Sequence, residues 1–232
     1  MSDRPQRVMV CSPHPDDAEI GASGTIAKWV STGTQVLYVI CTNGDKGSSD
    51  PKMTSPKLAA IRKKEQTKAA KTLGVQEVVF LDHGDGELED TREFRGELVR
   101  EIRRFKPDAV MTVDPFRKSF YMHRDHRMTG QVTLDAVFPY ARDHLHFPEH
   151  KALGLEPHKV GEVYLWGTET PDHYEDISDT IDLKAKATKC HVSQFSRPDR
   201  DIGEFIRDHA KNNGKKKGME FAEAFRLIQL RR

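Results

Sequence analysis

The sequence predicts a doubly wound α/β fold, a mainly parallel sheet with helices on both faces, followed by an irregular C-terminal third. Two observations predict it. Short, continuous apolar runs alternate with stretches of helical periodicity over about the first 140 residues, as in sheets that helices cover on both faces. Polar and ionisable residues follow several of the apolar runs directly, where parallel sheets form their ligand sites. With 232 residues, we expect a single domain over residues 1–232.

The individual elements follow from these patterns. Apolar runs predict strands at 7–11, 35–41, 78–81, 108–114 and 162–167. Apolar residues at helical spacing predict helices at 19–31, 57–73, 91–105, 124–136 and 183–190. Gly74 ends the second helix, because glycine tolerates the left-handed position that follows a helix. Residues 138–157 are expected to form a long ordered loop, and 221–230 a closing element of undefined type.

Composition and charge exclude several classes of protein. Lys and Arg total 37 against 36 Asp and Glu, for a net charge of +1, so no overall field would attract nucleic acid or an anionic membrane. Charged residues make up 31% of the chain and no apolar run could span a bilayer, so we expect no membrane insertion. The N-terminus resembles no signal peptide. The cysteines, Cys11, Cys41 and Cys190, are odd in number and widely spaced, which favours a cytoplasmic location without disulfides.

The strongest motif for function is Pro-His-Pro-Asp-Asp-Ala-Glu at 13–19, directly after the first strand. The two prolines restrict the backbone around His14 and hold its imidazole in place. His14 and Asp17 offer one nitrogen and one oxygen ligand, which suits Zn²⁺. Asp16 would then stay uncoordinated beside the metal. The alternative is that Asp16 and Asp17 only cap the following helix.

A second motif, His-Arg-Asp-His at 123–126, follows the fourth predicted strand. It should reach the same edge of the sheet as the first motif. Two ligands from 13–19 and one histidine from 123–126 would leave an open fourth position, as in a catalytic zinc site. Asp125 is suited to hydrogen-bond a ligand imidazole and fix its tautomer. The alternative is a polar helix start with surface histidines.

Together these motifs make the chain resemble the PIG-L/LmbE-like zinc N-deacetylases. The supporting segments are the loop that begins Thr-Asn-Gly-Asp-Lys-Gly and the helix Ile-Arg-Lys-Lys-Glu-Gln-Thr-Lys-Ala-Ala-Lys-Thr-Leu-Gly-Val. Further likeness lies in His-Val-Ser-Gln-Phe (191–195) and Phe-Ala-Glu-Ala-Phe-Arg (221–226). The family fold is Rossmann-like, and its members deacetylate N-acetylglucosamine units. After residue 198 the chain follows the family less closely.

The resemblance implies roles for individual residues. The implied zinc ligands are His14, Asp17 and His126. Asp16 would be the general base, and His123 would polarise the carbonyl or protonate the leaving amine. In some members, residues that match Arg62 and Asp85 contact the substrate. Family relatives are often assemblies, so a homo-oligomer is possible.

The sequence therefore predicts a zinc-dependent hydrolase that removes an acetyl group from a small N-acetylglucosamine-type substrate. Three alternatives stay open. The enzyme could be an amidase that cleaves a larger N-acyl group from an amino-sugar conjugate. It could be a zinc-binding protein without catalysis. A nucleotide-binding module is the third, although the first turn is rich in carboxylates and lacks Gly-x-Gly-x-x-Gly, so it would repel a pyrophosphate.

Overall fold

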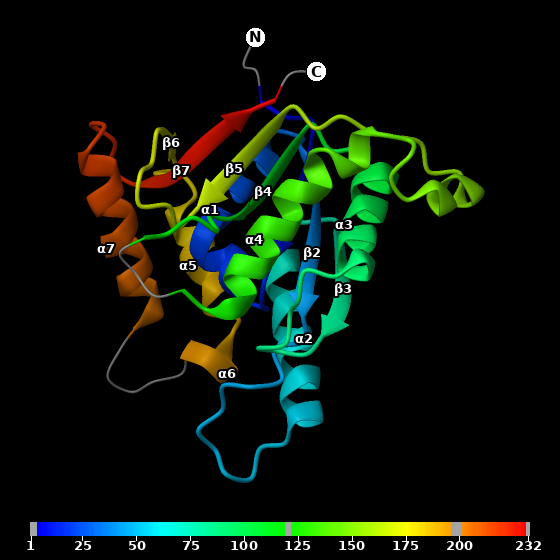
Figure 1. The fold of residues 1–232 in the computed structure, drawn as a ribbon. Coiled ribbons are helices and arrows are strands. Elements are labelled where there is room, and N and C mark those ends of the chain that lie inside the picture. Colours follow the sequence, from blue (N-terminus) through cyan, green and yellow to red (C-terminus); the bar gives the residue numbers. More distant parts are fainter. Residues whose placement is uncertain (1–3, 119–121, 196–200, 231–232) are drawn as a thin grey trace.

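A computed structural model describes residues 4–118, 122–195 and 201–230. Within them the chain forms a seven-stranded sheet with the strand order β3-β2-β1-β4-β5-β7-β6 (Figure 1). The strands are β1 (Arg7–Ser12), β2 (Gln35–Thr42), β3 (Glu77–His83), β4 (Ala109–Val113), β5 (Glu162–Trp166), β6 (His173–Asp176) and β7 (Ala222–Gln229). Strands β1 to β5 pair in parallel, whereas β7 is antiparallel to both β5 and β6. The predicted α/β fold with a mainly parallel sheet is confirmed.

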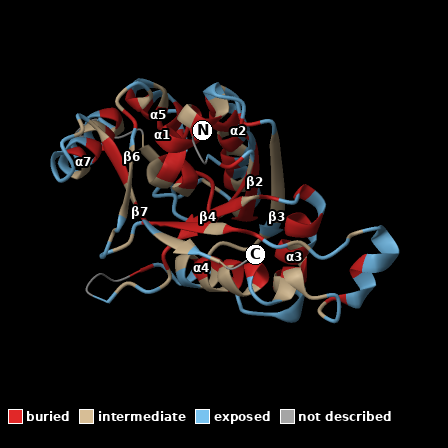
Figure 2. Ribbon diagram, turned by 90° about the horizontal axis from the view of Figure 1, so that it is seen from above, coloured by how far each residue is buried: buried red, intermediate tan, exposed pale blue. Residues whose placement is uncertain are grey.

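Helices cover both faces of the sheet, as expected. The longer ones are α1 (Asp17–Ser31), α2 (Ser55–Leu73), α3 (Arg92–Phe105), α4 (Arg124–Val137), α5 (Ile181–Thr188) and α7 (Ile202–Lys215), and α6 (Val192–Phe195) is a single turn. Side chains of α1, α2 and α5 share a core with one face of the strands, and side chains of α3 and α4 share the other. Figure 2 shows the buried central strands between these layers.

The two cores follow from the alternation of side chains along each strand. In β1, Val8 and Val10 belong to the core under α1, whereas Met9 and Cys11 belong to the core under α3 and α4. Because both faces are covered, the strand is apolar throughout, which is why the sequence identifies it. None of the helices in the described ranges has the length and apolar character needed to cross a bilayer.

The C-terminal third holds more regular structure than the sequence indicates. Neither β6 nor α7 was predicted. The buried positions of α7 include Ile206 and Ala210, a narrow apolar stripe within a polar segment that gives a weak helical pattern. The closing segment is the antiparallel strand β7.

Residues 138–157 form an arm beside α3, at the upper right of Figure 1, and two short 3₁₀ helices lie in it, Tyr140–Arg142 and Pro148–Leu153. Buried Arg103 anchors this arm. Its guanidinium donates hydrogen bonds to backbone carbonyls of five arm residues: Tyr140, Ala141, Asp143, His146 and Phe147. One charged side chain thus supplies hydrogen-bond donors to five carbonyl groups of the arm's irregular backbone.

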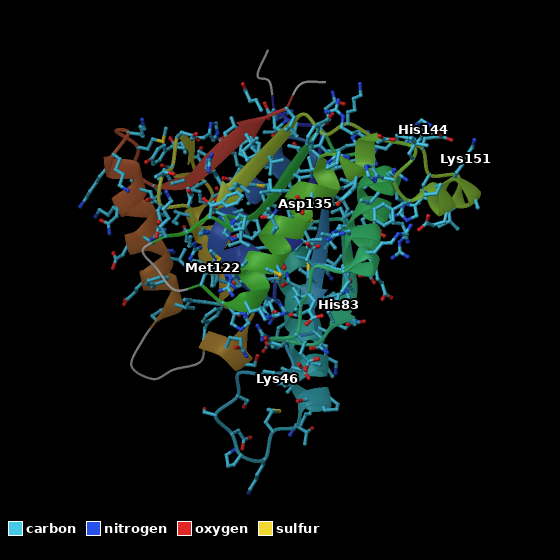
Figure 3. All side chains as sticks on the ribbon, in the orientation of Figure 1. Lys46, His83, Met122, Asp135, His144 and Lys151 are labelled. Atoms are coloured by element: carbon cyan, nitrogen blue, oxygen red, sulfur yellow. The ribbon has the colours of Figure 1, made fainter. Side chains whose placement is uncertain are left out.

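The topology fixes where a ligand site should form. The chain moves outward from β1 to β3 on one side and from β4 to β5 on the other, so the strand order reverses between β1 and β4. Ligands of open α/β sheets bind at the carboxyl ends of strands beside such a reversal. The carboxyl ends of β2 and β3 point downward in Figure 3. Lys46 after β2, His83 at the end of β3 and Met122 after β4 lie toward that side.

Candidate active site

Both sequence motifs meet at this edge. Residues 13–16 connect β1 to α1, and His123 occupies the position immediately before α4. The ring centroid of His14 lies 4.7 Å from that of His123 and 5.3 Å from that of His126. Two segments more than 100 residues apart in the chain therefore share one cluster, as the sequence predicts.

The two ring nitrogens of His14 face different partners. Nδ1 lies 3.0 Å from Asp17 Oδ2, and His126 Nε2 lies 3.2 Å from the same oxygen. On the other side, His14 Nε2 lies 3.0 Å from Asp125 Oδ2 and 3.2 Å from Asp85 Oδ1. His14 thus contacts two sets of side chains: Asp17, which also contacts His126, and the carboxylates of Asp85 and Asp125.

This arrangement fits a metal ion. The ligand atoms of His14, Asp17 and His126 lie within 4.8 Å of one another, and a second such group contains His14, Asp85, His123 and Asp125. Two imidazoles and a carboxylate form a common ligand set for catalytic zinc. Ligand histidines usually donate their other ring N–H to a carboxylate, and Asp125 is placed to accept it from His14 Nε2.

Asp125 is itself rigidly held. Its carboxylate is fully buried and accepts hydrogen bonds from the backbone N–H groups of Gly86 and Leu88. Burial raises the pKa of this carboxyl, but the hydrogen bonds from His14, Gly86 and Leu88 outweigh burial and lower it. Asp125 is therefore an ionised acceptor that fixes the orientation of the His14 ring.

Asp16 differs from Asp17 in its surroundings. It occupies the position before α1 but makes no capping hydrogen bond through its side chain, so capping does not explain it. Its carboxylate accepts a hydrogen bond from Arg62 Nη2 at 3.1 Å. Burial and the negative charge of Asp17 raise the pKa of Asp16 to about 7, although Arg62 opposes them. The pKa of Asp17 is instead lowered, because the neighbouring charges of His126 and His14 outweigh its burial.

His123 is the most accessible of the clustered histidines, with 47% of its side chain exposed. Its Nδ1 accepts a hydrogen bond from the backbone N–H of Asp125 at 3.1 Å. Burial and the charge of His14 lower the pKa of His123, and Asp125 partly offsets them. Because Nδ1 is an acceptor, Nε2 carries the proton of the neutral ring and is the nitrogen that can donate.

Arg62 and Asp85 also reach the cluster. Arg62 is only 5% exposed in its side chain, and its guanidinium donates to the backbone oxygens of Pro15 and Gly44 as well as to Asp16. It also lies 3.7 Å from Asp85 Oδ2. Through these hydrogen bonds Arg62 holds the loop after β2 and the carboxylate of Asp16 in place.

A buried network behind Asp16 was not predicted from the sequence. The backbone N–H of Asp16 donates to Gln66 Oε1 at 3.1 Å, Gln66 Nε2 donates to Glu19 Oε1 at 3.0 Å, and His191 Nε2 lies 3.2 Å from Glu19 Oε2. All three side chains are fully buried. One signal was present: Arg62 and Gln66 are polar residues within the buried helical face of α2.

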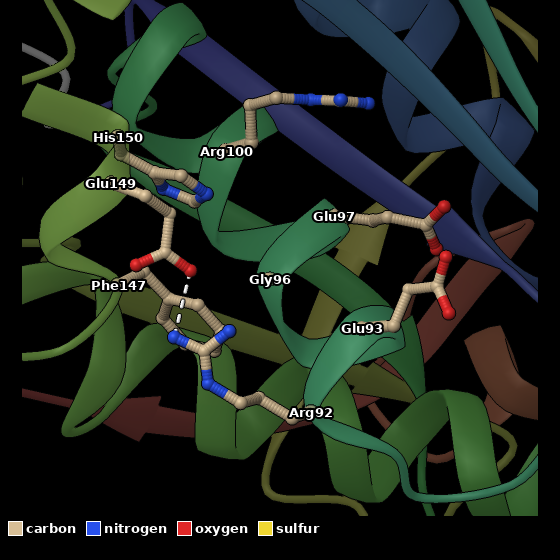
Figure 4. A pocket seen from close by; sticks show the side chains of 8 residues that line it. All are labelled: Arg92, Glu93, Gly96, Glu97, Arg100, Phe147, Glu149 and His150. Atoms are coloured by element: carbon tan, nitrogen blue, oxygen red, sulfur yellow. Dashed lines mark hydrogen bonds and ion pairs between the residues drawn. The ribbon is translucent and has the colours of Figure 1, made fainter. Parts of the chain in front are cut away.

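A pocket of about 670 Å³ opens from the cluster. Asp17 and His126 are among its lining residues, and α7, β7 and residues 166–171 supply most of the remaining wall. This size is typical of small-molecule sites. A second cavity of about 520 Å³ lies between α3 and the arm, where Arg92 pairs with Glu149 (Figure 4), and no residue of the cluster lines it.

Comparisons with known proteins identify the family of the chain. Residues 9–137 match the model of the family described as PIG-L, GlcNAc-PI de-N-acetylase. The chain belongs to the PIG-L family. The diacetylchitobiose deacetylase of Thermococcus kodakarensis is 35% identical over 96% of this chain and 83% of its own length. The mycothiol S-conjugate amidase of Streptomyces coelicolor is 36% identical over 66% of this chain and 59% of its own length.

Solved structures extend the comparison. The N,N'-diacetylchitobiose deacetylase of Pyrococcus horikoshii superimposes with a TM-score of 0.90 at 36% identity, covering 97% of this chain and 84% of that one. A hydratase of Pseudomonas putida, GalB, also shares the fold, with a TM-score of 0.81 at 21% identity over 98% of both chains. The PIG-L fold by itself therefore does not define one reaction. Together with the family match, the deacetylase and amidase relatives identify this PIG-L protein as a hydrolase that acts on amides.

Proposed function

We propose that the chain is a zinc-dependent hydrolase that removes the N-acetyl group from an N-acetylglucosamine-type sugar. The observation that carries this proposal is the two-sided environment of His14. Its Nδ1 faces Asp17 Oδ2, which His126 Nε2 also approaches, and its Nε2 faces the buried acceptor Asp125. His14, Asp17 and His126 would hold the ion. Bound Zn²⁺ supplies a Lewis acid that polarises the amide carbonyl and lowers the pKa of the attacking water.

In this proposal Asp16 is the general base. It accepts a proton from the attacking water, and a base whose pKa lies near neutrality is well matched to that step. Arg62 fixes the orientation of its carboxylate. His123 lies at the exposed side of the cluster, where Nε2 can donate to the developing oxyanion or to the leaving nitrogen. Asp125 orients His14, and Asp85 and Arg62 are candidates for contacts with sugar hydroxyls.

One alternative has support from a relative. The mycothiol S-conjugate amidase favours an enzyme that releases a larger acyl group from an amino-sugar conjugate. A nucleotide-binding role is disfavoured, because Asp17, Asp85 and Asp125 contact His14. Asp16 adds a fourth carboxyl that interacts electrostatically with Asp17 and His14, and such a cluster would repel a pyrophosphate. The three cysteines are free and buried, which is compatible with the predicted cytoplasmic location, and the homo-oligomer stays a prediction.

The test is a reconstitution assay. The purified chain is stripped of metal with a chelator, supplied with Zn²⁺, and incubated with N-acetylglucosamine and its conjugates. We expect release of acetate and of a free amine in equal amounts, only after zinc is added. Equal rates with and without zinc would contradict the metal assignment. Release of larger acids, with no acetate from any N-acetyl sugar, would support the amidase instead.

A further inference from the structure

Residues 191–195 join the C-terminal third of the chain to the helices that carry the site. His191 lies directly before the single turn α6, which Figure 1 shows at the carboxyl edge of the sheet. The backbone N–H and the hydroxyl of Ser193 donate to the carboxylate of Glu65 on α2, at 2.8 and 2.6 Å. The imidazole of His191 reaches Glu19 on α1. The proposed mechanism uses none of these residues.

His191 is fully buried, and its ring faces Glu19. Nε2 lies 3.2 Å from Glu19 Oε2, and Nδ1 has no hydrogen-bond partner within the described ranges of the chain. The backbone of His191 is fixed as well, because its N–H donates to the carbonyl of Thr188 and its carbonyl accepts from the N–H groups of Gln194 and Phe195. The hydrogen bonding of the ring therefore acts through Glu19.

The charges around His191 make Nε2 a donor. Burial lowers the pKa of His191, but the hydrogen bond to Glu19 and the charge of Glu19 outweigh burial and raise it, and the charges of Asp16 and Glu65 add to the rise. The ring therefore keeps its proton to higher pH than an exposed histidine, and an imidazolium carries a proton on both nitrogens. Glu19 is itself fully buried, and a carboxylate at that depth needs donors for its oxygens.

The remaining links connect Glu19 to the backbone of Asp16. Gln66 Nε2 donates to Glu19 Oε1 at 3.0 Å, and Gln66 Oε1 accepts from the backbone N–H of Asp16 at 3.1 Å. The carboxamide of Gln66 can accept from Asp16 only with its NH₂ group turned toward Glu19, so Glu19 must present an acceptor there. Because His191 donates to Oε2, Oε1 stays available as that acceptor.

We propose that His191 is a positioning residue for the general base. Its Nε2–H fixes the carboxylate of Glu19, Glu19 orients the carboxamide of Gln66, and Gln66 holds the backbone of Asp16 in the conformation that the base requires. The proposal rests on the proposed function, because it takes Asp16 as the base. It gives the His-Val-Ser-Gln-Phe segment a role in catalysis that passes through α1 and α2.

The experiment compares His191→Asn with His191→Gln in the zinc-loaded chain, with N-acetylglucosamine as the substrate. Both variants carry an amide, but only the longer glutamine places its nitrogen where Nε2 of the imidazole lies. For His191→Asn, we expect kcat to fall by about 10- to 100-fold, the scale of a small misplacement of a catalytic group. KM and zinc content should stay within about twofold, because His191 touches neither the substrate nor a ligand. For His191→Gln, kcat should recover to within about fivefold of the unmodified value, because a neutral donor again faces Glu19.

Thr188→Val is the matched control. Thr188 is fully buried in the turn before His191, and its hydroxyl donates to the carbonyl of Lys184 within α5. Loss of this bond should lower the free energy of unfolding in urea and leave kcat unchanged. Equal losses of kcat in His191→Asn and His191→Gln, no loss in either, or a loss of the same size in Thr188→Val would overturn the positioning role.

Nuclear magnetic resonance separates this proposal from the proposed function. In the unmodified chain, the ring nitrogen signals of His191 should show a proton on Nε2. The amide proton signal of Asp16 should shift in His191→Asn, but not in His191→Gln or Thr188→Val. An unprotonated Nε2, or an Asp16 signal that His191→Asn leaves in place, would overturn the proposal whether or not the chain is active. If the chain releases no acetate from any N-acetyl sugar, the proposed function fails, whereas these signals still decide whether His191 positions Asp16.

Discussion

The carboxamide of Gln66 holds the backbone of Asp16 at a hydrogen-bond distance of 3.1 Å. Asp16 has φ 120° and ψ −28°, a conformation that costs a residue other than glycine about 1–3 kcal/mol. Gln66 and Arg62, both from α2, hold Asp16 in this conformation through its N–H and its carboxylate. In this conformation the carboxylate of Asp16 accepts a hydrogen bond from Arg62 and caps no N–H group of α1.

A swap of two side chains tests this support. In Gln66→Glu, the new carboxylate would face that of Glu19, so we expect kcat to fall by about 10²-fold, the scale of a small misplacement of a catalytic group, with zinc content unchanged. In the double variant Q66E/E19Q, a donor again faces an acceptor at each step from Asp16 to His191. Its kcat should recover to within about fivefold of the unmodified value. A double variant as slow as the single one would show that the hydrogen-bond chain does not position Asp16.

His123→Ala should separate catalysis from metal binding. His123 lies outside the His14–Asp17–His126 group, so zinc content should be unaffected. Loss of a donor to the developing oxyanion or leaving amine should lower kcat by about 10²-fold. The measurement pairs elemental analysis with initial rates. A variant that lost zinc in parallel with activity would place His123 among the ligands, in the second group of candidate ligand atoms.

Gly21→Ala tests how tightly Trp166 packs on α1. Helix propensity alone would make alanine more stable than glycine by about 1 kcal/mol. The new methyl would lie 2.5 Å from the ring of Trp166, and such overpacking costs about 1–3 kcal/mol. We expect a net loss of unfolding free energy in urea and a lower kcat/KM. The control is Ser31→Ala at the exposed end of the same helix. A rise in stability for Gly21→Ala would mean that Trp166 moves freely.

The ion pair between His83 and Glu97 predicts a pH-dependent contribution to stability. The two groups lie 2.6 Å apart, and the hydrogen bond that His83 donates to Glu97 raises the pKa of His83 above its ordinary value. A histidine whose pKa is raised by folding stabilises the folded state fully at pH values below its unfolded pKa, about 6.5. This stabilisation is lost as pH rises through the pKa of the folded state. Because both side chains are partly exposed, the pair contributes less than about 1 kcal/mol.

The measurement compares Glu97→Gln with the unmodified chain in urea at pH 5.5 and pH 9. The difference in unfolding free energy should be present at pH 5.5 and nearly absent at pH 9. A difference that is equal at both pH values would argue that Glu97 stabilises the fold without its charge.

The position of a residue in the fold or the site could be predicted from the sequence where a single local pattern determines it. The parallel strands are apolar on both faces, and the two motifs follow β1 and β4, so both the sheet and the His14–His126 cluster could be foreseen. The network of Gln66, Glu19 and His191 was not predicted, because it joins side chains from three distant segments and no local pattern shows that they meet. Helix α7 was missed because few of its residues face a core, and with it the wall of the pocket was missed.

Zinc content and acetate release, measured together on Asp16→Asn and His126→Ala, test the central claim most directly. Asp16→Asn cannot accept a proton at neutral pH, so it should retain zinc while kcat falls by at least about 10²-fold. His126→Ala should lose both zinc and activity on dialysis, because one of three protein ligands is gone. The account would be contradicted if Asp16→Asn lost its zinc, or if His126→Ala kept full zinc occupancy and hydrolysed the substrate at the unmodified rate.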